Sequence, residues 1–296
     1  AGFNPPYGAP INYYLKTGSD STVRDSAGTK LVSKDSVSIT ISDASGALVR
    51  TLKAPVNAGI NRVWWNLRAD LTKQAKLRTS PEYAPWYTVQ LEGRNAPSLG
   101  RVGVLVPPGT YTVKLTAPSG RVEQQQIVVR KDPNSVGTQA DLDQNIALVR
   151  QLRTDLDETV GMVNSLENVR GQLWAFKATM SGDSTRKEIV DGADSLDIKL
   201  RGVERRLFQT RITGRGQDQV RYPMRLGEQI QYLADQLQTS DNAPTESQRQ
   251  VAAVLREQLT AAKVEFDRVM TREVAAYNSM LQQRKIPNVI SDQQQR

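Results

Sequence analysis

Histidine and cysteine are both absent from this chain of 296 residues. Their absence excludes Ser-His-Asp and Cys-His nucleophile systems, zinc sites built from Cys and His, disulfides and thiol redox chemistry. Any catalysis would have to use carboxylates or the side chains of Lys, Tyr, Ser and Thr. We therefore expect no catalytic residues, no metal site and no cofactor, and we expect that the chain is not an enzyme.

Long apolar runs are missing as well. No stretch of the sequence approaches the ~20 consecutive apolar residues of a membrane-spanning helix, so we expect no membrane span. Residues 1–8, with the sequence AGFNPPYG, contain neither a basic start nor an apolar run. We interpret them as the start of a mature protein whose signal peptide has been removed.

Charge and composition divide the chain near residue 131. Residues 1–131 carry 17 Lys and Arg against 8 Asp and Glu, a net charge of +9, whereas residues 132–296 carry 22 against 23, a net charge of −1. The first part also holds 10 of the 14 prolines and 10 of the 17 aromatic residues. The run Asp132-Pro133-Asn134 interrupts both strand and helix patterns, so we place the domain boundary there.

Period-two alternation predicts antiparallel strands in residues 1–131. Short runs rich in Val, Ile, Thr, Tyr and Trp are separated by Gly, Pro, Ser and Asp clusters, a pattern typical of a β-sandwich. Two long insertions, at residues 17–35 and 68–106, interrupt this domain, and long loops in compact domains often bind or pack. The predicted strands cover residues 11–16, 37–42, 48–52, 61–67, 110–116 and 125–129.

Apolar residues recur every three or four positions in residues 132–296, which predicts helices. The first helix covers about residues 138–178 and, at ~1.5 Å per residue, is on the order of 60 Å long. Helices of this length cannot bury their apolar stripes alone, so the pattern predicts an antiparallel bundle of about four helices. The other predicted helices cover about residues 185–207, 226–237 and 245–281.

Two of the predicted helices begin with capping-box spacing. Thr185 is followed by Glu188, and Thr245 is followed by Gln248. Gly182 and Asp183 supply a turn before the first of these pairs. Together with the strands, these helices predict an α+β multidomain chain: a β-sandwich in residues 1–131 and a helical bundle in residues 132–296.

Three segments of the first domain are similar to the Ig-like module of flagellar hook-capping (FlgD-like) proteins. They are residues 37–52, residues 58–68 with the run GINRVWWNLR, and residues 106–115. Two further segments resemble motifs in the C-terminal region of exported bacterial proteins that carry sortilin-like, BNR-repeat β-propellers. These segments are Asn4-Pro5-Pro6-Tyr7-Gly8-Ala9 and Asp241-Asn242-Ala243-Pro244-Thr245.

The resemblance implies an Ig-like β-sandwich followed by helices, and a secreted or cell-surface location outside the bacterial cytoplasm. Proteins of this kind are often labelled glycoside hydrolases because of their propeller repeats. No propeller is present in these 296 residues, so the resemblance transfers no activity to the chain.

Five aromatic residues are the candidate binding residues: Trp64, Trp65, Tyr83, Trp86 and Tyr87. Trp64 and Trp65 are adjacent on a predicted strand, so one should fill the core and the other should point outward. The outward ring and the three aromatic residues of the insertion form one hypothetical platform for stacking sugars. The favoured interpretation is burial, in which the insertion covers the outward tryptophan or packs between the two domains.

Carboxylates offer two weaker hypotheses. Glu82 and Glu92, with Asp70 nearby, are the residue type that acid/base glycoside cleavage requires, but a solvated loop explains them equally well. Three aspartates spaced by three, at positions 191, 194 and 197, suggest calcium, yet they lack the loop glycine of an EF-hand and are better explained as a solvated helix face. Gly214-Arg215-Gly216 lacks the ending of a phosphate-binding loop and is interpreted as a flexible link.

The positive charges are scattered, with no Lys/Arg cluster longer than two. This pattern argues against a nucleic acid partner and favours an acidic protein, an acidic polysaccharide or a cell-envelope surface. We expect a non-enzymatic, extracytoplasmic structural or protein-interaction module that self-associates into an oligomer or filament, with its extended start pairing along a neighbour's edge strand.

Two other hypotheses stay open. The first is an accessory or binding region of an exported β-propeller glycoside hydrolase-like protein, with a preceding propeller domain as its partner. The second is an enzyme in its own right that uses Glu82 or Glu92.

Overall fold

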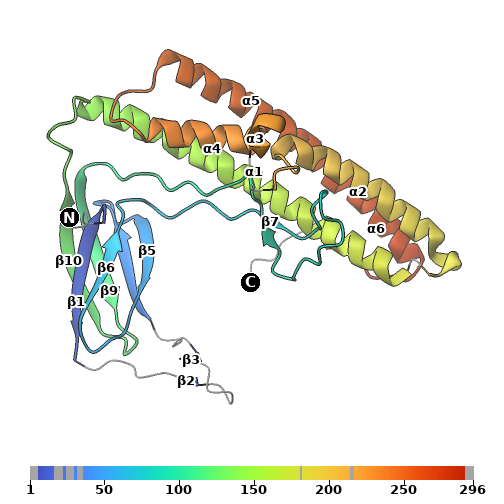
Figure 1. Cartoon of the computed structure of the whole chain (residues 1–296), viewed down its shortest axis with the longest axis horizontal. Coiled ribbons are helices and arrows are strands. Elements are labelled where there is room, and N and C mark those ends of the chain that lie inside the picture. The colour runs from blue at the N-terminus through green and yellow to red at the C-terminus, as the bar shows by residue number, and fades with distance from the viewer. Residues whose placement is uncertain are drawn as a thin grey trace. The chain divides into compact units, whose positions relative to one another are not determined.

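The computed structural model describes residues 6–16, 23–24, 30–31, 36–180, 182–213 and 217–290. It is an α+β structure with antiparallel sheets and helices, which confirms the fold class at that level. The contacts divide the chain into two compact units (Figure 1). The first comprises Ala1–Leu71 and Gly103–Ile146, and the second comprises Thr72–Val102 and Ala147–Arg296.

Two larger antiparallel sheets make up most of the described strand part of the first unit (Figure 1). One sheet pairs β1 with β6, and the other has the order β10-β9-β4-β5. Each strand expected from the sequence overlaps one of these six. Their bounds are β1 Ala9–Leu15, β4 Val37–Ser42, β5 Leu48–Ala54, β6 Gly59–Trp65, β9 Gly109–Thr116 and β10 Val122–Val129.

Four very short strands were not expected. β2 (Val23–Arg24) pairs with β3 (Lys30–Leu31) inside the insertion at 17–35, most of which lies outside the described residues. β7 (Lys76–Leu77) pairs with β8 (Arg94–Asn95) inside the insertion at 68–106. Two residues are too few to show an alternating pattern, so these strands left no readable signal.

The two larger sheets of the first unit share one hydrophobic core. Val37, Ile39 and Ile41 alternate with polar residues along β4 and are fully buried. Trp65 of β6 is also fully buried, and its ring meets Tyr111 of β9 edge to face, with 5.4 Å between ring centroids. The period-two pattern therefore places the apolar half of β4 in the same core as a ring from the facing sheet.

Gly8 fixes how β1 enters its sheet. Its φ angle is +124°, a conformation that side chains disfavour. A Cβ atom at this position would lie 2.1 Å from the carbonyl oxygen of Trp65. The next residue, Ala9, is the register partner of Trp65. Of the extended start expected to pair along a neighbour's edge strand, residues 1–5 lie outside the described residues, and Ala9 and Pro10 pair with Trp65 and Trp64 of β6 in the same chain.

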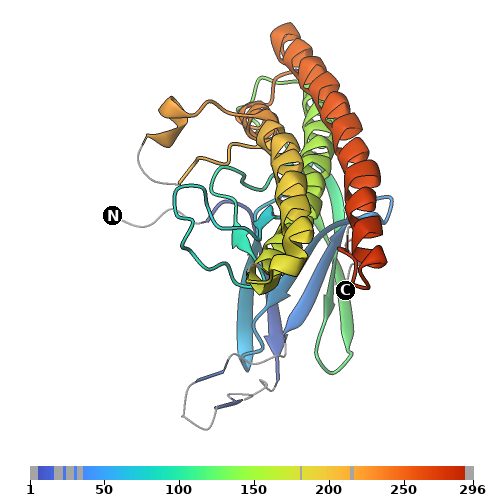
Figure 2. The same ribbon diagram turned by 90° about the vertical axis from the view of Figure 1, so that its right-hand side faces the viewer.

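The longer helices lie side by side in the second unit, and Figure 2 shows them from a second direction. The first of them, α1, has 42 residues, which at ~1.5 Å per residue agrees with the expected length. Its first residues, up to Ile146, are grouped with the first unit. The bounds are α1 Gln139–Met180, α2 Lys187–Leu207, α3 Asp218–Arg221, α4 Leu226–Leu237, α5 Glu246–Arg268 and α6 Val274–Gln283.

Helix starts and continuity differ in part from the sequence predictions. The capping box of Thr245 and Gln248 is confirmed at the start of α5. The box expected from Thr185 and Glu188 is wrong: Asp183 accepts hydrogen bonds from the N–H and hydroxyl of Thr185 at 2.9 and 2.5 Å, and Glu188 pairs with Arg284. The last expected helix is interrupted by a π-helical turn, Val269–Glu273, between α5 and α6.

The insertion at residues 72–102 belongs to the helical unit rather than to the strands around it. The backbone N–H groups of Lys73 and Lys76 donate to Asp157 and Asn164 of α1, at 2.6 and 2.7 Å. This grouping differs from the boundary expected at residue 131. Composition can place only a single boundary between two consecutive parts of the chain. Here the chain leaves the first unit at residue 72, packs on α1 and returns to the first unit at residue 103.

None of the helices that the structure describes is both long enough and apolar enough to cross a membrane.

Candidate functional site

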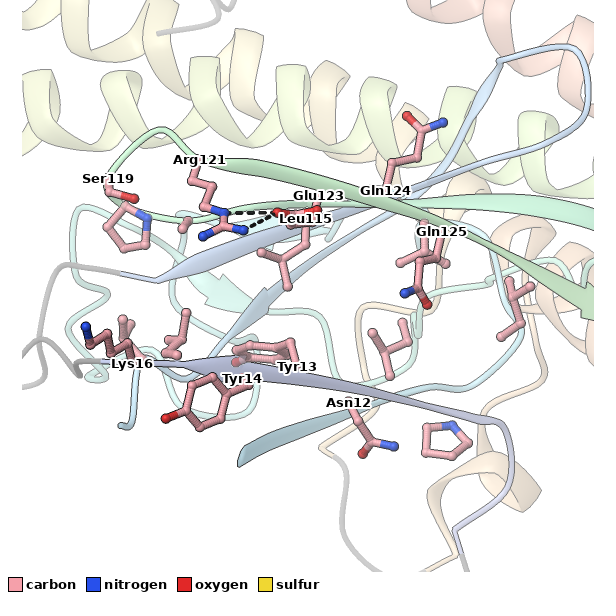
Figure 3. A pocket seen from close by; sticks show the side chains of 18 of the residues that line it. Asn12, Tyr13, Tyr14, Lys16, Leu115, Ser119, Arg121, Glu123, Gln124 and Gln125 are labelled. Atoms are coloured by element: carbon pink, nitrogen blue, oxygen red, sulfur yellow. Dashed lines mark hydrogen bonds and ion pairs between the residues drawn. The ribbon is translucent and has the colours of Figure 1, made fainter. Parts of the chain in front are cut away.

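A groove in the first unit lies between β1 and β10 and has a volume of about 1180 Å³ (Figure 3). Both strands are sheet edges: among the described strands, β1 pairs only with β6, and β10 pairs only with β9. An edge strand presents a row of backbone N–H and C=O groups that a further strand can pair with. The groove is therefore bordered by two surfaces that can accept hydrogen bonds from, and donate them to, an extended chain.

The floor of the groove is apolar. Ile11, Tyr13 and Leu15 face inward along β1 and are half-buried, while Val113 and Leu115 of β9 face them from the other sheet. The hydroxyl of Tyr13 donates a hydrogen bond to the carbonyl oxygen of Pro55. Burial raises the pKa of this phenol, so it stays a neutral donor at ordinary pH.

The β10 wall of the groove is polar and exposed. Glu123 is the register partner of Leu115, and Gln125 is the register partner of Val113, so both lie on the inward face of the sheet. Figure 3 shows Gln125 directed toward β1 and Gln124 directed away. At one end, Arg121 and Glu123 form an ion pair of 2.7 Å in which both side chains are exposed.

This polar wall exists because the two sheets have different widths. Within the described part of the chain, the sheet of β10, β9, β4 and β5 has four strands, and the facing sheet consists of β1 and β6. The inward side chains of β10 are half-buried at Ile127 and Val129 and exposed at Glu123 and Gln125. The groove lining thus offers backbone groups and side-chain amides, which can bind an extended peptide.

Trp64 and Trp65 lie on opposite faces of β6. Trp65 is fully buried in the core, and its indole N–H donates to the carbonyl oxygen of Arg68 at 3.0 Å. Trp64 is half-buried. The buried tryptophan is a structural residue, because its ring has no solvent-facing surface on which a ligand could stack.

Tyr83, Trp86 and Tyr87 belong to the second unit, and their exposed fractions are 44%, 81% and 49%. Their loop is held by its own hydrogen bonds, since the N–H of Tyr87 donates to Ala84 and the hydroxyl of Ser80 donates to the carbonyl of Tyr87. The three rings therefore stand exposed on an ordered loop. Trp64 and Trp65 belong to the other unit.

Two of the three candidate acids, Glu82 and Asp70, pair with arginines. Glu82 pairs with Arg205 of α2 at 2.8 Å, and Asp70 pairs with Arg50 at 3.5 Å. Partial burial of Glu82 opposes ionisation, but the hydrogen bond and the charge of Arg205 lower its pKa below the ordinary value. A lowered pKa suits a structural ion pair rather than a general acid. Glu92 is exposed.

A buried charge cluster in the second unit escaped the sequence analysis. Arg170 of α1 contacts Asp197 at 2.8 Å and both Glu167 and Glu204 at 2.5 Å. All four side chains are buried. The sequence does contain a sign of this cluster, because the charged residues Glu167 and Arg170 interrupt the apolar stripe of Leu166, Val169 and Leu173.

Asp197 corrects the interpretation of the spaced aspartates as a solvated face. It is buried and pairs with both Arg170 and Arg201, whereas Asp194 pairs with Lys177 and Asp191 is exposed. Within the part of the chain that the structure describes, no group of three or more acidic residues is placed to hold a metal ion. The interpreted link at residues 214–216 lies outside the described residues.

The cluster also shifts the pKa values of Glu204 and Arg170. Burial, followed by the neighbouring Glu167, raises the pKa of Glu204 well above its ordinary value. Burial alone would lower the pKa of Arg170, but the three carboxylates around it raise it. Thr79 joins the cluster by donating its N–H and its hydroxyl to Glu167, both at 2.9 Å. The cluster therefore joins α1, α2 and the insertion.

No protein-family model matches this sequence, and no curated protein matches it either. The function has to be argued from the geometry.

Proposed function

We propose that this chain is a non-enzymatic structural module that assembles with copies of itself through the free strand edges of its first unit. The observation that carries this proposal is the groove bordered by two strand edges, β1 and β10, with which no further described strand pairs. Strand addition at such an edge supplies affinity through backbone hydrogen bonds and needs no catalytic group. Seven paired residues, the length of β1, span roughly 23 Å.

We further infer the finer architecture expected from the sequence. Two facing antiparallel sheets with a shared core support an Ig-like sandwich for the first unit. The short connection between Met180 and Lys187 favours a return of α2 along α1, which supports an antiparallel bundle for the second unit. This combination agrees with the resemblance to the C-terminal region of exported propeller proteins and with a location outside the cytoplasm.

Sedimentation velocity over a wide range of protein concentration tests the proposal. We expect a concentration-dependent dimer or larger species, weakened by a proline placed in a free edge, because proline removes a backbone donor. The circular dichroism of this proline variant must show the same helix content as the wild type, which is the control for folding. A chain that sediments as a monomer at every concentration would refute self-assembly.

The exposed loop aromatics favour a second function, an accessory region that binds carbohydrate beside a propeller domain. Tyr83, Trp86 and Tyr87 present ring faces on an ordered loop, which is what stacking of a sugar requires. A glycan array with the wild-type chain and the Trp86→Ala variant tests this function. The Tyr14→Ala variant is the matched control, because Tyr14 is an exposed aromatic residue of the first unit. Binding that Trp86→Ala loses and Tyr14→Ala keeps supports it; no saturable binding contradicts it.

A further inference from the structure

The free edges of the first unit differ in how well they are protected. Natural sheets discourage edge pairing with Lys, Arg or Pro in the edge strand. β5 contains Arg50 and Lys53, β6 contains Arg62, and β1 contains Pro10. β10 contains none of these residue types, and its one charge, Glu123, is neutralised by Arg121. β10 is therefore the edge most open to pairing.

The outward face of β10 is also self-complementary. Val122, Gln124, Gln126 and Val128 share this face, and the order of residue types is the same in either direction about Gln125. When two such strands pair antiparallel with Gln125 opposite Gln125, valine meets valine and glutamine meets glutamine. The valines are 47% and 60% exposed, so pairing would bury apolar surface that now faces water.

Other registers lose this match. With Gln126 opposite Gln126, Val122 faces Arg130 and Gln124 faces Val128. With Gln124 opposite Gln124, both valines face glutamines or leave the paired region. A two-fold axis allows only registers in which one residue faces its own copy, so the register centred on Gln125 is the favoured one.

We propose that β10 of one chain pairs antiparallel with β10 of a second copy, with Gln125 facing Gln125, so that two four-stranded sheets join into one. This inference rests on the proposed self-assembly and identifies the contact between the two copies, which we call the β10 joint. One strand pair buries less area than a standard protein interface, so association is weak and depends on concentration.

The absence of native cysteine makes single-cysteine crosslinking a direct test. Residues directly opposite in an antiparallel pair have Cα atoms about 4.5–5.5 Å apart, within disulfide range. Under mild oxidation, Gln125→Cys should therefore form a covalent dimer. Gln124→Cys is the matched control, since its own copy lies diagonally, at ~7–8 Å, beyond that range. Mixing Gln124→Cys with Gln126→Cys should restore crosslinking.

A charge variant provides a second measurement without oxidation. Gln124→Lys combined with Gln126→Lys places two lysine pairs across the joint and should weaken dimerisation roughly fivefold or more. Gln124→Lys combined with Gln126→Glu places opposite charges across the same joint and should retain dimerisation. All three glutamines of β10 are exposed, so these changes leave the core intact.

The outcomes separate the two proposals. Equal crosslinking of the Gln124→Cys and Gln125→Cys variants would show random collision and overturn the β10 joint. The wild-type chain could self-associate while no cysteine variant of β10 crosslinks and no charge variant weakens the association. This result would overturn pairing through β10 but would still support self-assembly. A wild-type chain that never associates would overturn both.

Discussion

At the scale of single residues, neighbouring side chains of the same type have different roles because their surroundings differ. Trp65 fills the core while Trp64 stays half-buried on the other face of the same strand. Asp197 is buried among arginines, while Asp191, six residues earlier, is exposed. The residue type alone therefore does not decide between a structural and a solvated role.

Trp65→Ala should destabilise the first unit by about 3–5 kcal/mol, because it opens a cavity in the core and removes the edge-to-face contact with Tyr111. Trp64→Ala should cost clearly less. Hydrogen exchange of the β4 and β9 amides measures both effects. Equal protection in the two variants would contradict the assignment of Trp65 to the core.

Glu204 predicts an unusual dependence of stability on pH. Its folded pKa lies well above the ordinary 4.5, so between these two values the folded state binds more protons than the unfolded state. Stability is therefore fully present below the ordinary pKa and falls as pH rises through this window.

Glu204→Gln stays neutral and should lose much of that fall, so that it is at least as stable as the wild type at mildly alkaline pH. Urea unfolding at mildly acidic and mildly alkaline pH measures this difference. Glu82→Gln is the matched control: its carboxyl has a lowered pKa, so the stability it contributes is lost as pH falls rather than as it rises. A steep alkaline fall that persists in Glu204→Gln would contradict the prediction.

At the scale of elements, caps and edges depend on which partner is nearest in space. Thr245 and Gln248 cap α5 as their spacing predicts. Asp183, rather than the pair of Thr185 and Glu188, caps the turn that leads into α2. Strand edges also depend on neighbours in space: β10 is an edge because no described strand other than β9 pairs with it.

Asp183→Ala should lower the stability of the α2 end of the helical unit, because the N–H of Thr185 loses its acceptor. Glu188→Ala should cost less, since Glu188 contributes only an exposed ion pair with Arg284. Thermal unfolding followed by helical circular dichroism ranks the two variants. The reverse order would restore the capping box that the sequence suggested.

At the scale of the whole molecule, the insertion at residues 72–102 changes how charge is distributed. Counted over the two units, the first carries 12 Lys and Arg against 9 Asp and Glu, and the second carries 27 against 22. The basic excess assigned to residues 1–131 is therefore shared, with +3 on the first unit and +5 on the second. The attraction expected for an acidic partner would therefore involve both units.

Asn164→Ala should loosen the insertion without affecting the strands that flank it in sequence. The Asn164 amide accepts from the N–H of Lys76 at 2.7 Å and donates to the carbonyl of Gln74 at 3.1 Å. We expect faster hydrogen exchange in residues 72–102 and unchanged exchange in β9. Faster exchange in β9 as well would show that the insertion follows the strands rather than α1.

Local periodicity by itself determined the longer strands and helices of this protein. Alternation located the strand at Val37–Ser42, and spacing by three and four located α1 and α4, because these patterns arise from the geometry of neighbouring residues. Tertiary structure alone decided the rest. Thr79 meets Glu167 across 88 positions of sequence, and the groove lies between strands more than a hundred residues apart. No short window of sequence contains both partners of such a contact, so only packing could bring them together.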